Sequence, residues 1–454
     1  MSLLIQNGTL ILPQGPRRAD LLVERGKIAA IGEGLQGDET LRADGQLVFP
    51  GFIDPHTHFE MNKGAPNETA DDFSSGTAAA LAGGTTTILD FATQDRGDTL
   101  LHALETWHNR ADGHCSCHYG FHMAITDWNG TTREQLSAMT AEGVTSYKLY
   151  LAYDNLRLSD AAAYEVVRAA AAQGALVSAH CENGDLVNEG IAREKAAGHL
   201  TPAAHPVSRP DCVEAEAVSR WLTIGELCGV PVYVVHLSTA RGLALIRAAR
   251  ARGQRVYVET CPQYLLLNSK QYLLPGFEGA QFVCSPPLRA QESCDALADA
   301  LVRGEIDVVS TDHCSFTMDT KALGADDFSA IPNGLPGVEH RPVLLYTLLR
   351  KMGRFDPVLM KDLLSSRPAR LFGMPQKGEL LPGRDADMVL WDPAARWTIT
   401  AAAQLQRSGY TPFEGTPVEG MARTVLLDGR VAARDGQVVC PNLGRYVPRQ
   451  PVLG

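Results

Sequence analysis

Eight short apolar runs with strand character recur between residues 51 and about 370, and helical stretches separate several of them. The strand-like runs end or lie at residues 47–58, 85–91, 118–125, 146–151, 175–180, 232–236, 256–260 and 307–312. Helical stretches include the alanine-rich segment 160–173 and the segment 214–228. Eight parallel strands joined by crossover helices form a (β/α)8 TIM barrel. In that fold, functional side chains lie at the C-terminal ends of the strands.

Short strands and turns flank this region on both sides. Residues 1–50 alternate apolar runs with turns such as Asn7-Gly8 and Arg25-Gly26, which is typical of hairpins. Strand-like runs return after about residue 375. We therefore predict three segments: 1–50 as the N-terminal part of a β-sandwich, 51–375 as the barrel, and 376–454 as the C-terminal part of the sandwich. Residues 441–454 are rich in proline and glycine, so we expect an extended tail that could lie on a neighbouring subunit.

Composition and charge exclude several classes of protein. The net charge of −11 argues against nucleic acid and anionic membranes as partners. No uninterrupted apolar run approaches the roughly 20 residues that cross a bilayer, and the first residues do not resemble a secretory signal. The ten cysteines are scattered without a Cys-x-x-Cys pair, so we expect reduced thiols and a cytoplasmic location.

Six side chains that could bind metal fall on the barrel strands, at or near their ends. They are His56, His58, Lys148, His180, His236 and Asp312. Imidazole and carboxylate groups suit zinc or a similar divalent ion. Each residue alone has an ordinary explanation, such as a hydrogen-bonded structural histidine, a surface lysine or a helix-capping aspartate. Six of them on strands of one barrel favour a metal site.

Lys148 needs a separate explanation, because an ammonium group repels a metal ion. Burial lowers the pKa of a lysine, and its neutral amine can then add carbon dioxide to form a carbamate. A carbamate carries a negative charge on two oxygens and can bridge two metal ions. Water bound to such ions has a pKa near ~7, and the resulting hydroxide attacks carbonyl carbons. The residues therefore predict a two-metal hydrolase.

The sequence around these positions resembles the amidohydrolase superfamily and, within it, the dihydropyrimidinase and D-hydantoinase group. The matching stretches are GFIDPHTH, SYKLYLAY, AHCENGD, VYVVHLS, ETCPQYL, CSPPLR, STDHCSF and IPNGLPGVEHR, between residues 51 and 341. The resemblance implies a cyclic amidohydrolase that opens hydantoins or dihydropyrimidines to N-carbamoyl amino acids. It also implies a homotetramer that acts on a small cyclic amide or ureide without an organic cofactor.

The resemblance also assigns a role to each site residue. Two zinc ions, bridged by N6-carboxylated Lys148, would be held by His56, His58, Lys148 and Asp312 on one side and by Lys148, His180 and His236 on the other. Tyr153 would donate a hydrogen bond to the substrate carbonyl and stabilise the oxyanion. Ser285 and Asn333 would bind the imide edge of the ring, mostly through backbone groups. Asp312 would move a proton from the attacking water to the leaving nitrogen.

Several alternatives share this barrel. Allantoinase and dihydroorotase act on related rings, but the Pro-Gln-Tyr-Leu and Asn-Gly-Leu-Pro-Gly stretches favour the hydantoinase branch. Mononuclear deaminases lack the bridging lysine and place a glutamate soon after the third histidine, whereas His236 is followed by Leu237. A non-catalytic scaffold of the same fold is a remote alternative. Such relatives have lost metal ligands, whereas this sequence keeps all six candidate ligands.

The resemblance further implies that three loops, at residues 59–71, 93–99 and 150–160, would contact the ring substituent. Two positive residues in these loops, Lys63 and Arg157, bear on this contact. These charges would favour a polar or acidic substituent if they face the site. They would have no effect on substrate choice if they point into solvent.

Overall fold

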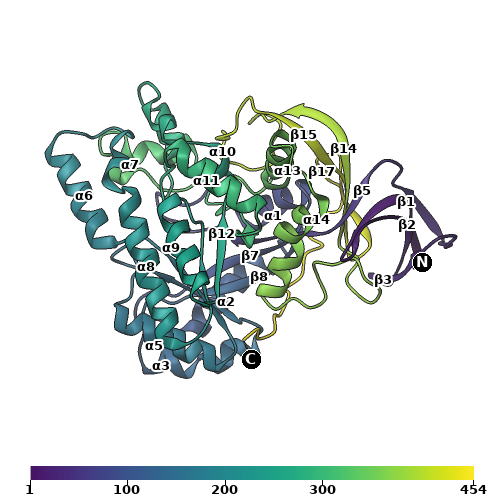
Figure 1. Ribbon diagram of the computed structural model, residues 1–454, viewed down its shortest axis with the longest axis horizontal. Coiled ribbons are helices and arrows are strands. Elements are labelled where there is room, and N and C mark those ends of the chain that lie inside the picture. The colour runs from purple at the N-terminus through teal and green to yellow at the C-terminus, as the bar shows by residue number, and fades with distance from the viewer. Residues whose placement is uncertain (1, 454) are drawn as a thin grey trace.

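The computed structural model describes residues 2–453 and shows a (β/α)8 barrel beside a second sheet (Figure 1). The barrel strands are β6 (Phe52–Thr57), β7 (Thr85–Thr93), β8 (His118–Ala124), β9 (Ser146–Tyr150), β10 (Leu176–His180), β11 (Val232–Val234), β12 (Val256–Thr260) and β13 (Val308–Val309). They pair in parallel in chain order. A parallel bridge between Thr57 and His313 joins the end of the first strand to the segment that follows the last one. The predicted TIM barrel is therefore confirmed.

Two barrel strands are shorter than the sequence predicts. The sixth strand ends at Val234 rather than at residue 236, and the eighth covers only Val308–Val309 rather than 307–312. The polar residues that follow them, His236 and Asp312, have φ angles of 36° and 53°. A positive φ is incompatible with a strand and uncommon outside glycine. These two strands therefore end shortly before His236 and Asp312, where the backbone leaves the extended conformation.

Helices cover the outside of the barrel (Figure 1). The longer ones are α1 (Phe73–Ala82), α2 (Leu100–Ala111), α5 (Asp160–Ala172), α6 (Gly184–Ala196), α8 (Asp211–Cys228), α9 (Ala240–Ala251), α11 (Gln291–Val302) and α13 (Arg341–Lys351). The two predicted helices correspond to α5 and α8. Ser159 caps the N-terminus of α5 by accepting a hydrogen bond from Ala162 N at 3.2 Å. Gly229 ends α8 in the left-handed conformation.

Shorter helical segments lie in the connecting loops. The α-helical ones are α3 (Gly130–Glu134), α4 (Leu136–Ala141), α7 (Ala204–Ser208), α10 (Pro262–Leu266), α12 (Met318–Lys321), α14 (Pro357–Lys361) and α15 (Arg367–Leu371). The remaining ones, with 3-10 or π geometry, are η1 (Ser269–Leu273), η2 (Glu278–Phe282), η3 (Ala322–Gly324), η4 (Phe328–Ala330) and η5 (Asp362–Ser366).

Both ends of the chain build the second sheet, as the sequence predicts. Its strands are β1 (Ser2–Leu12), β2 (Gly15–Glu24), β3 (Lys27–Gly32), β4 (Glu39–Arg42), β5 (Leu47–Pro50), β14 (Met388–Thr398), β15 (Pro417–Leu427), β16 (Arg430–Arg434) and β17 (Gln437–Val438). They form one nine-stranded sheet, in which antiparallel pairing of β5 with β14 joins the two ends. Apolar residues from both ends, including Leu10, Leu21, Met388 and Leu426, share its core.

The apolar run at residues 47–58 serves both sheets. It splits at Gly51, so that β5 belongs to the nine-stranded sheet and β6 to the barrel. A Cβ atom on Gly51 would lie 2.0 Å from Oγ1 of Thr86, so only glycine fits at this crossing. The turn at Gly51 thereby sets the position of β6, the strand that carries His56.

The C-terminal tail is extended, and it lies against the barrel of its own chain (Figure 1). Backbone N–H groups of Val447, Arg449 and Val452 donate to carbonyls of Tyr119, Gly143 and Gly174 at 2.8–2.9 Å. These carbonyls belong to the first residues of β8 or to the loops just before β9 and β10. The tail therefore crosses the N-terminal end of the barrel, opposite the end where functional groups are expected.

Within residues 2–453, each helix is too short or too polar to cross a membrane. All ten cysteines are free thiols.

Candidate active site

A cavity of about 910 Å³ opens at the C-terminal ends of the barrel strands. All nine residues singled out from the sequence line it: His56, His58, Lys148, Tyr153, His180, His236, Ser285, Asp312 and Asn333. Residues of the three predicted loops, such as Asn62, Asp95 and Leu156, also line it. The structure therefore brings the whole predicted set together in one place.

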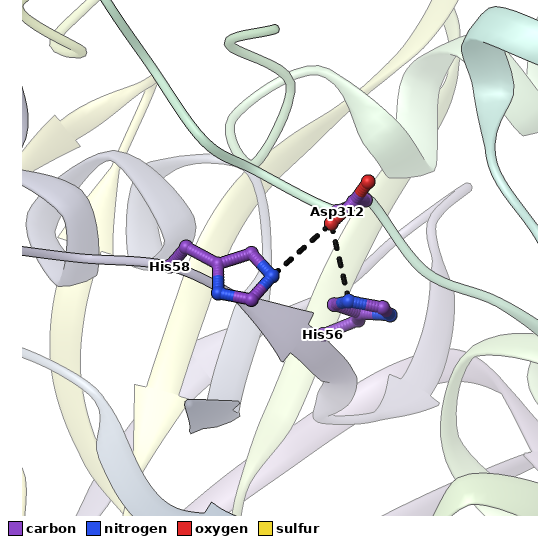
Figure 2. Close-up of side chains that lie close together, drawn as sticks. All are labelled: His56, His58 and Asp312. Atoms are coloured by element: carbon purple, nitrogen blue, oxygen red, sulfur yellow. Dashed lines mark ion pairs between the residues drawn. The ribbon is translucent and has the colours of Figure 1, made fainter. Parts of the chain in front are cut away.

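His56, His58 and Asp312 converge on one point (Figure 2). The Nε2 atoms of the two histidines lie 3.1 and 3.3 Å from Oδ1 of Asp312. Two ligands bound tetrahedrally to zinc, at bond lengths of 2.0–2.1 Å, are ~3.3 Å apart. The three ligand atoms thus have the spacing of a shared divalent ion. The i, i+2 spacing of the histidines accounts for their common direction.

His180 and His236 form a second pair beside the first. Nδ1 of His180 lies 3.1 Å from Nε2 of His236, which again matches two ligands of one ion. Nδ1 of His236 is buried and has no hydrogen-bond partner among the described residues. Nε2 of His180 is bonded to Glu182, so Nδ1 is the nitrogen left for a metal.

Lys148 lies among these histidines, fully buried at 1% exposure. Its Nζ lies 4.9 Å from the centre of the Phe91 ring and 5.4 Å from that of Tyr150. Burial lowers the pKa of Lys148 to about 8, although Asp312 and Glu259 act in the opposite direction. The explanation of Lys148 as a surface lysine is therefore wrong. Burial thus favours the neutral amine, the form that carbamate formation requires.

Two carboxylates behind the histidines escaped the sequence analysis. Glu259 accepts a hydrogen bond from Nδ1 of His56 at 2.7 Å, and Glu182 lies 2.9 Å from Nε2 of His180. Such carboxylates fix the tautomer and orientation of a metal-binding histidine. Their signals were present in the sequence: a lone acidic residue inside the apolar run 256–260, and a glutamate two residues after His180.

Tyr153 stands at the edge of the cavity with a φ of 68°, in the left-handed region. Burial raises the pKa of Tyr153 to about 12, while the nearby Arg209 acts to lower it. The phenol therefore stays protonated and can donate a hydrogen bond. Arg209 lies 5.7 Å from the centre of the Tyr153 ring and donates to Glu182 at 2.8 Å. One arginine thus contacts both the tyrosine and the carboxylate behind His180.

Ser285 and Asn333 present polar atoms without partners. Oγ of Ser285 and Oδ1 of Asn333 are buried and form no hydrogen bond with the described residues. Buried polar atoms are normally paired, so unpaired ones in a cavity are available to a bound molecule. Both residues are therefore placed to contact a substrate.

Lys63 and Arg157, the positive residues considered for substrate choice, differ in their surroundings. Arg157 forms ion pairs with Asp154 at 2.8 Å and with Asp185 at 2.7 Å, and it is absent from the cavity lining. Lys63 does line the cavity, but it is paired with Glu60 at 2.5 Å. The charge of Arg157 is therefore satisfied outside the cavity, and the hypothesis of a positive pocket for an acidic substituent loses its main residue.

A second group of potential metal ligands, His118, Asp387 and Asp428, lies near the N-terminal end of the barrel. Nδ1 of His118 accepts a hydrogen bond from the backbone N–H of Arg445 at 3.2 Å. In a neutral imidazole the proton must then be on Nε2, which faces the two carboxylates. Lys377 pairs with Asp387 at 2.5 Å. This group is therefore an ion network rather than a metal site.

The barrel and its buried imidazoles, lysine and aspartate are typical of hydrolases that use divalent metals. The model of the Amidohydrolase family matches residues 47–432, and the chain belongs to this family.

Individual relatives match over nearly the whole chain. It is 42% identical to D-hydantoinase of Geobacillus stearothermophilus, over 99% of this chain and 97% of the relative. It is 40% identical to D-hydantoinase of Ralstonia pickettii, over 99% of both. The crystal structure of dihydropyrimidinase from Brevibacillus agri NCHU1002 superposes with a TM-score of 0.97 at 40% identity, covering 99% of both chains. The resemblance expected from the sequence is thereby confirmed.

Proposed function

We propose that this protein hydrolyses the cyclic amide bond of hydantoins or dihydropyrimidines and releases N-carbamoyl amino acids. Full-length similarity to D-hydantoinases at about 40% identity supports this activity. The main structural observation in support of this activity is that all nine expected residues line one cavity. The chain is accordingly an enzyme, a cyclic amidohydrolase.

The site fits two divalent metal ions, for which we propose zinc. His56, His58 and Asp312 would hold one ion, His180 and His236 the other, and carboxylated Lys148 would bridge them. The ligand spacings of 3.1–3.3 Å and the lowered pKa of Lys148 support this assignment. Such ions polarise an amide carbonyl and lower the pKa of water, so that a hydroxide is available at neutral pH.

The residues of the chain then have distinct roles in ring opening. Ser285 and Asn333 bind the imide edge and orient the ring. The protonated phenol of Tyr153 donates to the carbonyl oxygen as negative charge develops on it. Asp312 accepts the proton of the attacking water and returns it to the ring nitrogen when the carbon–nitrogen bond breaks. Asp312 thereby ends the cycle unprotonated, as it began, and one proton is released overall because the new carboxylic acid ionises at neutral pH.

Another cyclic-amide hydrolase, such as an allantoinase, would use the same site geometry. The similarity to hydantoinases over the full chain favours the first reading. A scaffold without activity is disfavoured, because the cavity retains every expected ligand.

Ring opening by the purified protein tests the proposal. The protein would be supplied with zinc and bicarbonate and assayed on dihydrouracil, 5-phenylhydantoin, 5-carboxyethylhydantoin and allantoin, with Lys148→Ala as the control. Activity on a hydantoin or on dihydrouracil that the variant lacks would support the proposal. Activity on allantoin alone would favour the allantoinase alternative. If the unmodified protein neither binds metal nor opens any ring, the scaffold alternative would be favoured.

We further propose a homotetramer in the cytoplasm, with segments 1–50, 51–375 and 376–454 as the units of the chain. Sedimentation analysis of the purified protein would test the oligomeric state.

A further inference from the structure

We propose that the C-terminal tail positions the metal centre from the opposite end of the barrel, through a relay that starts at Arg449. The relay passes from Arg449 through Ser146 and His122 to the carbonyl of Pro55, the residue that precedes His56. This inference rests on the metal centre proposed above. It makes Arg449 a positioning residue rather than a catalytic one.

The tail enters the barrel instead of merely crossing it. Val447 and Arg449 are 8% and 3% exposed, while the residues between and beside them are more exposed. Val447 packs in the cluster that fills the lower barrel, together with Ile53 of β6, Leu89 of β7 and Leu176 of β10. Alternate residues of the tail therefore point inward, as in a strand laid over the barrel opening.

The rest of the chain is shaped to receive the tail. A Cβ atom on Gly373 would lie 1.9 Å from the carbonyl oxygen of Gln450, and one on Gly143 would lie 2.5 Å from Cα of Pro448. Real side chains do not tolerate such distances to backbone atoms, so glycine is required at both positions. The tail backbone thus occupies a groove that the sequence keeps free of side chains.

Arg449 is a buried cation without an acidic partner among residues 2–453. It donates from Nη1 to Oγ of Ser146 at 2.5 Å and from Nη2 to the carbonyl of Phe121. Burial lowers the pKa of Arg449 to about 10. A buried charge that lacks a counter-ion normally costs stability. Its presence at this position therefore calls for an explanation other than the stability of the tail.

The hydrogen bonds beyond Arg449 have a fixed direction. The carbonyl of Pro55 can only accept, so Nε2 of His122 must donate to it at 2.9 Å. In a neutral imidazole Nδ1 of His122 is then an acceptor, and it receives the hydroxyl proton of Ser146 at 2.5 Å. The oxygen of Ser146 is in turn the acceptor for Arg449. Burial, with Arg449 as the next contribution, lowers the pKa of His122 well below its usual value and keeps the ring neutral.

The relay also contacts the site through packed rings. His122 stacks on Phe91 at 4.8 Å between ring centres, and Phe91 stacks on His58 at 4.9 Å. Ser146 and Lys148 are two residues apart on β9, so their side chains share the face that points into the barrel. A displacement of Ser146 or His122 would therefore disturb the groups that position His56, His58 and Lys148.

Zinc affinity, measured by competition with a chelator, tests this relay in the full-length protein. Arg449→Met keeps the apolar stem but removes the donors, and we expect it to weaken zinc binding by about 10-fold, as for other outer partners of metal ligands. Arg449→Lys keeps a donor and should restore the affinity to within about 3-fold of the unmodified protein. Arg445→Met is the matched control, because Arg445 lies in the same tail but forms an exposed ion pair with Asp428. It should leave zinc affinity unchanged.

A double variant at Arg449 and Ser146 distinguishes an effect through the relay from a general loss of stability. If Arg449 acts through Ser146, the double variant Arg449→Met, Ser146→Ala should bind zinc no more weakly than Arg449→Met alone. Losses that multiply would overturn the relay. So would an Arg449→Met protein that melts earlier but binds zinc as tightly as the unmodified protein. Failure of the unmodified protein to bind zinc would instead contradict the proposed metal centre.

Discussion

Glu259 of β12 holds His56 of β6 across the barrel, with Oε1 2.7 Å from Nδ1 of the imidazole. The same carboxylate accepts from the hydroxyl of Tyr233 at 2.9 Å and from the backbone N–H of His236 at 3.2 Å. One buried side chain thus connects a residue from each of the two proposed metal ligand sets. This arrangement makes Glu259 an outer partner shared by both proposed metal ions.

Replacing Glu259 by Gln should weaken zinc binding by about 10- to 100-fold, because the amide keeps an acceptor but loses the charge that orients and polarises His56. Chelator competition would measure the change. Tyr233→Phe is the matched control, since it removes one donor and leaves the carboxylate intact. An unchanged zinc affinity in Glu259→Gln would contradict the role of Glu259.

Tyr153→Phe should lower kcat by about 100- to 1000-fold with little change in KM, because the phenol donates to charge that develops only in the transition state. Steady-state kinetics on the best substrate would measure both constants. Zinc content should be unaffected, since Tyr153 is not a proposed ligand. A change confined to KM would mean that Tyr153 binds the substrate without stabilising the oxyanion.

Carboxylation of Lys148 should depend on pH. The pKa of Lys148 is lowered to about 8 by burial, so the fraction of neutral amine rises as the pH increases through that value. Enzyme stripped of metal and carbon dioxide, then given zinc and bicarbonate, should recover activity faster at pH 8.5 than at pH 7 at equal dissolved carbon dioxide. Initial rates of reactivation would measure this dependence. A rate that does not change with pH would argue against carbamate formation at this amine.

Glu339 should make the stability of the protein depend on pH. Its carboxylate accepts from the backbone N–H groups of Leu405 and Gln406 at 2.8 and 3.3 Å, yet burial raises its pKa to about 7 from an ordinary value of 4.5. The folded state therefore binds this proton more tightly than the unfolded state does. The contribution is fully present below pH 4.5 and is lost as the pH rises through about 7.

The matched variant is Glu339→Gln, which keeps an acceptor but does not titrate. Between pH 4.5 and 7, the unmodified protein should lose stability relative to this variant, by about 3 kcal/mol in total. Melting temperatures of both proteins across this range would show the difference. Parallel curves would mean that Glu339 does not titrate there.

Strand patterns in the sequence were sufficient to predict the barrel and the six potential metal ligands, because parallel strands of a barrel end at the same face. Tyr153, Ser285 and Asn333 lie in loops, and only the family resemblance pointed to them. The sequence did not predict where β11 and β13 stop, because that depends on the positive φ angles of His236 and Asp312, which tertiary contacts impose. Glu259 escaped notice for a related reason. It is separated from His56 by 203 residues, and only closure of the barrel brings the two together.

The path of the C-terminal tail likewise depends on tertiary contacts that the sequence does not reveal. Its proline and glycine content predicts an extended segment, but the inward direction of Arg449 depends on Gly143 and Gly373, which are remote in sequence. Composition describes the backbone of such a segment, whereas its binding groove is a property of the folded barrel.

The pairing of β5 with β14 has a consequence for synthesis of the protein on the ribosome. Pro50 is paired with Met388, so more than 300 further residues must be synthesised before β14 can pair with the edge of β5. At typical translation rates of 5–20 residues per second, that interval lasts roughly 15–70 s. Throughout it, an apolar strand next to the one that bears His56 presents open hydrogen-bonding groups, which other unfinished chains could pair with. The yield of folded protein should therefore depend on how quickly translation reaches β14.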